Sequence, residues 1–192
     1  TFVIFMSSRL HSNGKGSVSA MMESIARNAG FRTGLYTSPQ LCQFSDRIRI
    51  NGENIGAQAF DNALEIALDC KGLDQPLTFF EVITIAAFLA FAQAGIEIAI
   101  LEVGLGGRWD ATNIIRNPLA TAITSIALEH TKILGSTTEQ IAREKAGIFK
   151  AGAPYVLGPL DERAESAAHQ IAQSIGAGPA LCLRLQKGAH FH

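Results

Sequence analysis

Hydrophobic residues recur at helical spacing in five stretches of the chain. The first stretch runs from Ser17 to Ala29 and is followed by Gly30, a residue typical of helix C-caps. Further helices are predicted at 60–68, 78–94, 136–145 and 161–175, and the stretch 78–94 is so apolar that we expect it to be buried. Ser136-Thr137-Thr138-Glu139 has the pattern of a capping box, which predicts a helix start at Ser136.

Short apolar runs between these helices predict strands at 33–37, 47–50, 96–103, 120–128 and 155–157. The runs 96–103 and 120–128 are nearly all aliphatic, as in strands covered on both faces, and the run 47–50 leads into Asn51-Gly52, a hairpin-turn signal. Near the start, the segment 6–11 is polar for a buried strand, so either the first strand lies at 2–6 or this stretch differs from that of a working enzyme. The alternation predicts an α/β fold with a mostly parallel sheet and helices on both faces.

Composition narrows the class of protein without naming a function. The 192 residues are 47% hydrophobic and 17% charged, with a formal net charge of -1, which is typical of one folded domain and gives no basis for a nucleic-acid or membrane partner. The apolar segment 82–96 is shorter than the roughly 20 residues that span a bilayer. Three cysteines lie far apart, which favours a reducing, cytoplasmic location: Cys42, Cys70 and Cys182. We expect a monomer.

Domain boundaries follow from the same patterns. We expect one domain over residues 1–175, and we interpret the weakly periodic tail 176–192 as the start of a connection to an absent C-terminal domain. The chain begins at Thr1 with neither an initiator Met nor a signal peptide, which indicates a fragment.

A candidate phosphate loop lies between the first strand and the first helix. It consists of Asn13, Gly14, Lys15, Gly16 and Ser17. Glycines allow backbone N–H groups to face an anion at the helix start, and Lys15 adds a positive charge. The strict G-x-x-x-x-G-K-[ST] pattern is not met, because Arg9 replaces its first glycine and Gly16 follows the lysine. A glycine-rich turn with a solvated lysine is therefore the alternative.

Polar residues also follow the other predicted strands, and in parallel sheets such strand ends lie at one edge. Glu102 interrupts an aliphatic run, so its carboxylate needs a partner or a metal, and with the Ser38 hydroxyl it would suit Mg²⁺. The alternatives stay open at this point: Glu102 paired with Arg108, Ser38 as a turn residue, His130 as a structural histidine, Lys145 as a solvated charge, and Phe79-Phe80 as core.

Seven segments together resemble the folylpolyglutamate synthase/dihydrofolate synthase family, relatives of the Mur ligases. They are distributed over roughly residues 11–160, which is most of the chain, and they occur in the order of the family: SNGKGS, GLYTSPQL, RIRING, TFFEVIT, LEVGLGGRWDATN, TSIALEHT and REKAGI. The resemblance implies the P-loop NTPase-like central domain of a Mur ligase. It also implies an ATP-dependent ligase that adds L-glutamate to dihydropteroate or to a reduced folate through an acyl phosphate.

The resemblance also implies roles for individual residues. Residues 13–17 would bind the ATP phosphates, Ser38 and Glu102 one Mg²⁺, and His130 a second Mg²⁺ near the γ-phosphate. Lys145 matches a carbamylated lysine, Phe80 an aromatic residue that contacts the pterin, and Pro39 would lie against the folate. Arg108, Asp110 and Asn113 would shape the floor of the site.

The chain departs from the family pattern at several positions. His11-Ser12 replaces Gly-Thr, Glu129 replaces Asp before His130, Gln40 replaces a frequent His, and the second domain of the family is missing. Two other functions therefore remain as alternatives. One is a non-catalytic or incomplete fragment that binds Mg·ATP, and the other is a Mur-type ligase for another carboxylate substrate.

Overall fold

The computed structural model describes residues 2–7, 15–40, 42–69, 75–128 and 130–182. Among them, an eight-stranded sheet has the order β4-β3-β2-β5-β1-β6-β7-β8. The strands are β1 (Phe2–Ser7), β2 (Thr33–Tyr36), β3 (Ile48–Ile50), β4 (Glu53–Asn54), β5 (Ile98–Glu102), β6 (Ala120–Ile123), β7 (Tyr155–Leu157) and β8 (Ala180–Cys182). All pairs are parallel except β2–β3 and β3–β4.

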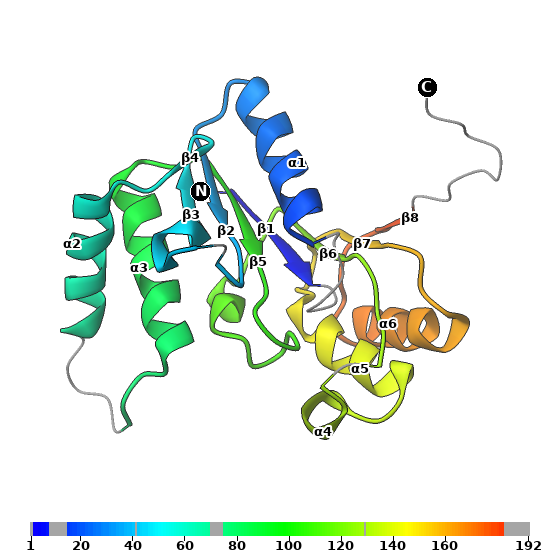
Figure 1. Ribbon diagram of the computed structural model, residues 1–192. Coiled ribbons are helices and arrows are strands. Elements are labelled where there is room, and N and C mark those ends of the chain that lie inside the picture. Colours follow the sequence, from blue (N-terminus) through cyan, green and yellow to red (C-terminus); the bar gives the residue numbers. More distant parts are fainter. Residues whose placement is uncertain (1, 8–14, 41, 70–74, 129, 183–192) are drawn as a thin grey trace.

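Helices cover both faces of this sheet, as predicted (Figure 1). They are α1 (Lys15–Asn28), α2 (Ala57–Leu68), α3 (Phe79–Gln93), α4 (Thr131–Leu134), α5 (Thr138–Lys145) and α6 (Glu162–Ser174), with 3-10 turns η1 (Phe44–Arg47), η2 (Ala111–Ile114) and η3 (Ala146–Ile148). On β5, Ala99 and Leu101 pack into the core shared by α2, α3, α5 and α6, whereas Ile98 and Ile100 pack with the α1 side. The alternation explains why the run is aliphatic throughout.

Several local predictions are confirmed. β1 occupies Phe2–Ser7, so the first of the two interpretations of the N-terminal segment holds. The Asn51-Gly52 turn connects β3 to β4, and both residues have the positive φ, 53° and 85°, that this turn requires. None of the described helices is long and apolar enough to cross a membrane.

Other local predictions differ from the structure. The helix start predicted at Ser136 is wrong: Thr137 is the N-cap of α5, and its side chain accepts from the backbone N–H of Gln140. The strand predicted at 120–128 ends at Ile123, and α4 was not predicted. β8 pairs with β7, so the sheet continues past residue 175, the predicted end of the domain. A three-residue edge strand is too short to show a period.

Candidate functional site

The carboxyl ends of β2, β5, β1 and β6 lie at one edge of the sheet, because these strands are parallel neighbours. Lys15, Gly16 and Ser17 form the first turn of α1, which follows β1. The backbone N–H groups of such a turn can bind an anion. Asn13 and Gly14, with His11 and Ser12, lie outside the described residues, as does Glu129.

Ser38 and Glu102 are brought together at this edge. Glu102 is the last residue of β5 and is 2% exposed, and its Oε2 accepts from the backbone N–H of Ser38 at 3.3 Å. The contact arises because Tyr36 on β2 is in register with Leu101 on β5. Arg108, the alternative partner of Glu102, has an exposed side chain. Carboxylate and hydroxyl oxygens are the kind of ligands that Mg²⁺ prefers, so this pair fits such an ion.

Lys145 ends α5 and is 6% exposed, so the alternative of a solvated lysine is wrong. The loop after β5 packs tightly against the end of this helix. A Cβ on Gly107 would come within 2.6 Å of the Lys145 carbonyl oxygen, and a Cβ on Gly147 within 2.5 Å of Arg108. Asn113 Nδ2 spans the two segments by donating to the carbonyls of Arg108 and Gly147, both at 3.0 Å.

His130 differs from Glu102 and Lys145 in its environment. It is exposed and is the N-cap of α4, with a left-handed φ of 49°. In the cavity described next, Ile133 and Leu134 of α4 are lining residues, whereas His130 is not. Within the described part of the chain, no cluster of three or more His, Cys, Asp or Glu side chains is arranged to hold a metal.

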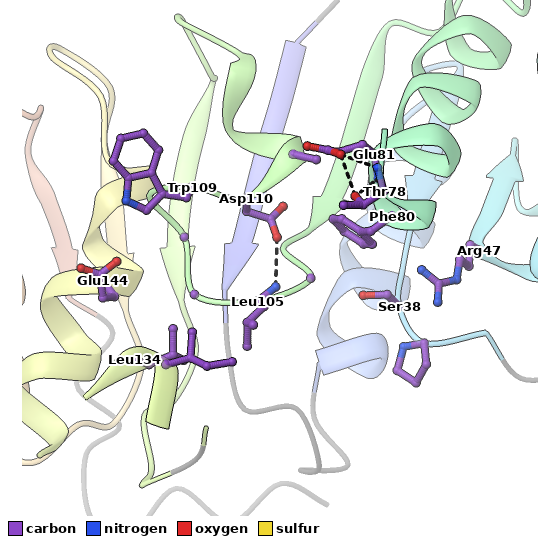
Figure 2. A pocket seen from close by; sticks show the side chains of 16 residues that line it. Ser38, Arg47, Thr78, Phe80, Glu81, Leu105, Trp109, Asp110, Leu134 and Glu144 are labelled. Atoms are coloured by element: carbon purple, nitrogen blue, oxygen red, sulfur yellow. Dashed lines mark hydrogen bonds between the residues drawn. The ribbon is translucent and has the colours of Figure 1, made fainter. Parts of the chain in front are cut away.

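A cavity of about 560 Å³, here called the strand-end cavity, opens beside Ser38 (Figure 2). It is lined by Ser38, Pro39, Arg47, Thr78, Phe80, Glu81, Gly104, Leu105, Gly106, Gly107, Trp109, Asp110, Ala111, Ile133, Leu134 and Glu144. Four residues predicted from the sequence therefore line it: Ser38, Pro39, Phe80 and Asp110. Glu102, His130 and Lys145 do not line it. Phe80 is half-buried against Gly104, where a Cβ would lie 2.5 Å from the ring.

Hydrogen bonds fix two carboxylates in the cavity wall. Asp110 accepts from the N–H of Leu105 at 2.9 Å, and from the N–H and hydroxyl of Thr112 at 3.0 and 2.6 Å. Glu81 accepts from the N–H and hydroxyl of Thr78, both at 2.7 Å, in the capping box of α3. These bonds from Thr78 lower the pKa of Glu81, so it is an anion at neutral pH.

Sequence reasoning missed two polar residues here. Arg47 lines the cavity and is 8% exposed. Tyr36 is fully buried behind it, with its hydroxyl 3.0 Å from that of Thr84 and its ring 6.0 Å from that of Phe80. Burial raises the pKa of Tyr36, and this is partly opposed by the hydrogen bond with Thr84 and by the charge and hydrogen bonding of Arg47. The RIRING and GLYTSPQL segments contain both residues, but only as members of strands.

Comparison with known proteins places these segments in a family. A family model described as the Mur ligase middle domain matches residues 12–176. The dihydrofolate synthase/folylpolyglutamate synthase of Escherichia coli is 42% identical over 165 residues, which are 86% of this chain and 38% of the relative. The mitochondrial folylpolyglutamate synthase of Bos taurus is 39% identical over 180 residues, 90% of this chain and 31% of the relative. The chain thus spans about a third of the length of these curated relatives.

Solved structures give the same result. Escherichia coli FolC in complex with ADP superposes with a TM-score of 0.86 at 39% identity, over 94% of this chain and 42% of that chain. The complex of the same protein with DHPP and ADP gives 0.84 at 38% identity, over the same shares. A bifunctional folylpolyglutamate synthase/dihydrofolate synthase with Mn, AMPPNP and L-glutamate bound gives 0.82 at 38% identity, over 95% of this chain and 43% of that chain.

The raised pKa of Tyr36 predicts a loss of stability at alkaline pH. Below the unfolded value of about 10 the phenol is neutral in both states, and above it the unfolded chain ionises first, so stability falls as pH rises through the folded pKa. Tyr36→Phe should flatten this alkaline decline in urea unfolding between pH 9 and pH 11. Thr84→Val removes the hydrogen bond but keeps the phenol, so its alkaline decline should persist. Equal declines in wild type and Tyr36→Phe would show that another group is responsible.

Proposed function

Because the chain belongs to the Mur ligase middle-domain family, we propose that it is the ATP-binding part of a ligase that joins L-glutamate to a folate. The observation that carries the proposal is the double position of Ser38. Its N–H contacts Glu102, a predicted metal ligand, and the residue also lines the cavity that contains Pro39 and Phe80, the predicted folate contacts. A phosphorylated carboxylate would therefore form where the strand ends that would bind the nucleotide adjoin the strand-end cavity.

The proposed reaction proceeds in two steps. A carboxylate oxygen of the folate attacks the γ-phosphorus of ATP, the bond to the β-phosphate oxygen breaks, and ADP leaves. The amino group of L-glutamate then attacks the acyl carbon of the acyl phosphate, loses a proton and expels phosphate. Such phosphoryl transfer depends on positioning and charge neutralisation more than on covalent help from the protein.

The residues predicted from the sequence would divide these tasks along the sheet edge. The first turn of α1, with Gly16 and Ser17, would bind phosphate oxygens, helped by Asn13, Gly14 and the Lys15 charge. Ser38 and Glu102 would hold one Mg²⁺ and His130 a second, as oxygen and nitrogen donors. Bound Mg²⁺ supplies charge neutralisation between the substrate carboxylate and ATP. Pro39 and Phe80 would contact the folate.

Lys145 would serve this site as a carbamate. Burying a charged ammonium is costly, and the side chain is 6% exposed. Addition of CO₂ to the amine, with loss of a proton, gives an anionic group that can support a metal ion. This role for Lys145 comes from the resemblance to the family.

The acceptor substrate, the cellular location and the oligomeric state stay predictions. Dihydropteroate and reduced folates both fit the proposal, and relatives carry both activities in their names. A cytoplasmic location is expected from the cysteine spacing, and the absence of nucleic-acid or membrane partners from the composition; a monomer is also expected.

The reaction itself is the first test. The chain should be incubated with Mg·ATP, L-glutamate and either dihydropteroate or tetrahydrofolate, while ADP release and product mass are measured. ADP formation that needs both co-substrates, with one glutamate added, would establish the ligase and its acceptor. Binding of Mg·ATP and pterin without turnover would favour the incomplete-fragment alternative. Binding of Mg·ATP without any pterin would leave a nucleotide-binding domain and refute the folate assignment.

Glu102→Gln should remove most of the Mg²⁺-dependent part of ATP affinity, because an amide is a much poorer ligand for a hard cation than a carboxylate. ATP titrations with and without Mg²⁺ measure that part separately. Glu97→Gln is the matched control: Glu97 precedes the same strand at its other end and accepts from the backbone N–H of Arg32. Unchanged Mg²⁺ dependence in folded Glu102→Gln would exclude Glu102 from the metal site.

Lys145→Ala should lower Mg·ATP affinity, and short carboxylates such as formate or acetate should restore part of it by replacing the carbamate. Affinity should be measured across a carboxylate titration. Lys150→Ala, at a nearby partly buried lysine that donates to the Asn113 carbonyl at 3.3 Å, should gain nothing from the same additives. Absence of rescue in a folded Lys145→Ala protein would count against the carbamate.

A further inference from the structure

Arg47 stands out as a buried charge with an incomplete set of partners. Its Nε and Nη2 donate to Gln40 Oε1 at 2.9 and 2.7 Å, which fixes one edge of the guanidinium. Its Nη1 is buried and has no hydrogen-bond partner among the described residues. The side chain lines the strand-end cavity, and Figure 2 shows the guanidinium turned toward the side where Ser38 and Phe80 lie.

The neighbouring ring does not replace this missing partner. The guanidinium carbon lies 5.5 Å from the centroid of Phe79, a cation–π contact that supplies no oxygen or nitrogen acceptor for Nη1. The N–H groups of Nη1 lie in the guanidinium plane, and a buried donor without an acceptor costs more than a hydrogen bond gains. The Tyr36 hydroxyl interacts with the Arg47 guanidinium and already pairs with the Thr84 hydroxyl, so a ligand in the cavity is the further acceptor that the guanidinium can take.

The charged side chains that line the cavity indicate which part of a ligand would accept a hydrogen bond from Arg47. Its lining includes three carboxylates, Glu81, Asp110 and Glu144, against the single guanidinium of Arg47. An anionic group would be repelled by this set, whereas a neutral ring with its own N–H donors would be favoured. The Phe80 ring, lying against Gly104, offers an aromatic surface for such a ring to contact.

We propose that Arg47 donates from Nη1 to an acceptor atom of the neutral heterocyclic ring of the substrate, and that Gln40 is a positioning residue that holds the guanidinium for this contact. The inference rests on the proposed function, since it takes the substrate to be a pterin. Gln40 is also a position where the chain departs from the frequent His of the family. Its amide oxygen accepts two N–H bonds from the same guanidinium.

Equilibrium binding of dihydropteroate tests the proposal, with Mg·ATP affinity measured on the same samples as evidence of folding. Arg47→Gln should weaken dihydropteroate binding about 10- to 100-fold, the effect of removing a charged hydrogen bond. Arg49→Gln is the matched control: this arginine lies two residues away on β3 and donates to Asn54 at 3.1 Å, outside the cavity lining. It should bind within about twofold of wild type.

Two milder variants keep the test decisive if Arg47→Gln does not fold. Arg47→Lys keeps the charge, and Gln40→Leu keeps the arginine but removes its acceptor. Both should weaken dihydropteroate binding while Mg·ATP affinity stays unchanged. Wild-type dihydropteroate affinity in these folded variants would overturn the proposal.

Two fragments of the substrate identify the part that Arg47 binds. Probes are 6-hydroxymethyl-7,8-dihydropterin, which has the ring without a carboxylate, and p-aminobenzoate, which has the carboxylate without the ring. The loss in the Arg47 variants should appear with the pterin fragment, and a loss confined to p-aminobenzoate would overturn the ring assignment. If wild type itself binds neither dihydropteroate nor the pterin fragment, the folate assignment fails, and the Arg47 inference fails with it.

Discussion

The close contact between two glycine-containing loops holds the site together. Gly107, after β5, lies so near the Lys145 and Glu144 carbonyls that a Cβ would come within 2.6 and 2.8 Å of them, and Gly147 is equally close to Arg108. The Asn113 amide locks the two segments from the side. Only glycine allows backbones to approach in this way. One contact thus connects the strand that ends in Glu102 to the helix that ends in Lys145, and it forms part of the wall of the strand-end cavity.

Charge burial gives this edge of the sheet its chemical character. Glu102, Lys145 and Arg47 are 2%, 6% and 8% exposed. Burying an ionised side chain lowers stability unless partners compensate for the lost hydration. The burial of these three side chains near one sheet edge therefore does not by itself stabilise the fold. The charges are more easily understood as a prepared environment for polar ligands. Tyr36 and Thr84 add a buried hydroxyl pair beneath the same cavity.

Much of the fold could be predicted from the sequence because its signals are local. Helical periodicity, the aliphatic β5 run and the Asn51-Gly52 turn each depend on neighbouring residues, and all three agree with the structure. The contact of Ser38 with Glu102 followed from strand order. The role of Gln40 could not be predicted, because its partner Arg47 is seven residues away across a loop. The burial of Lys145 also depends on distant packing, as does β8, which exists only because β7 offers it an edge.

Trp109 is the single tryptophan of the 192 residues, and its side chain is 88% exposed at the wall of the strand-end cavity. Indole fluorescence responds strongly to solvent contact and to nearby rings and charges. The emission spectrum of the unlabelled protein therefore comes from one known place, next to Asp110 and the loop after β5. Any molecule that covers this indole, whether a ligand in the cavity or another domain closing over it, shifts the spectrum without interference from a second tryptophan.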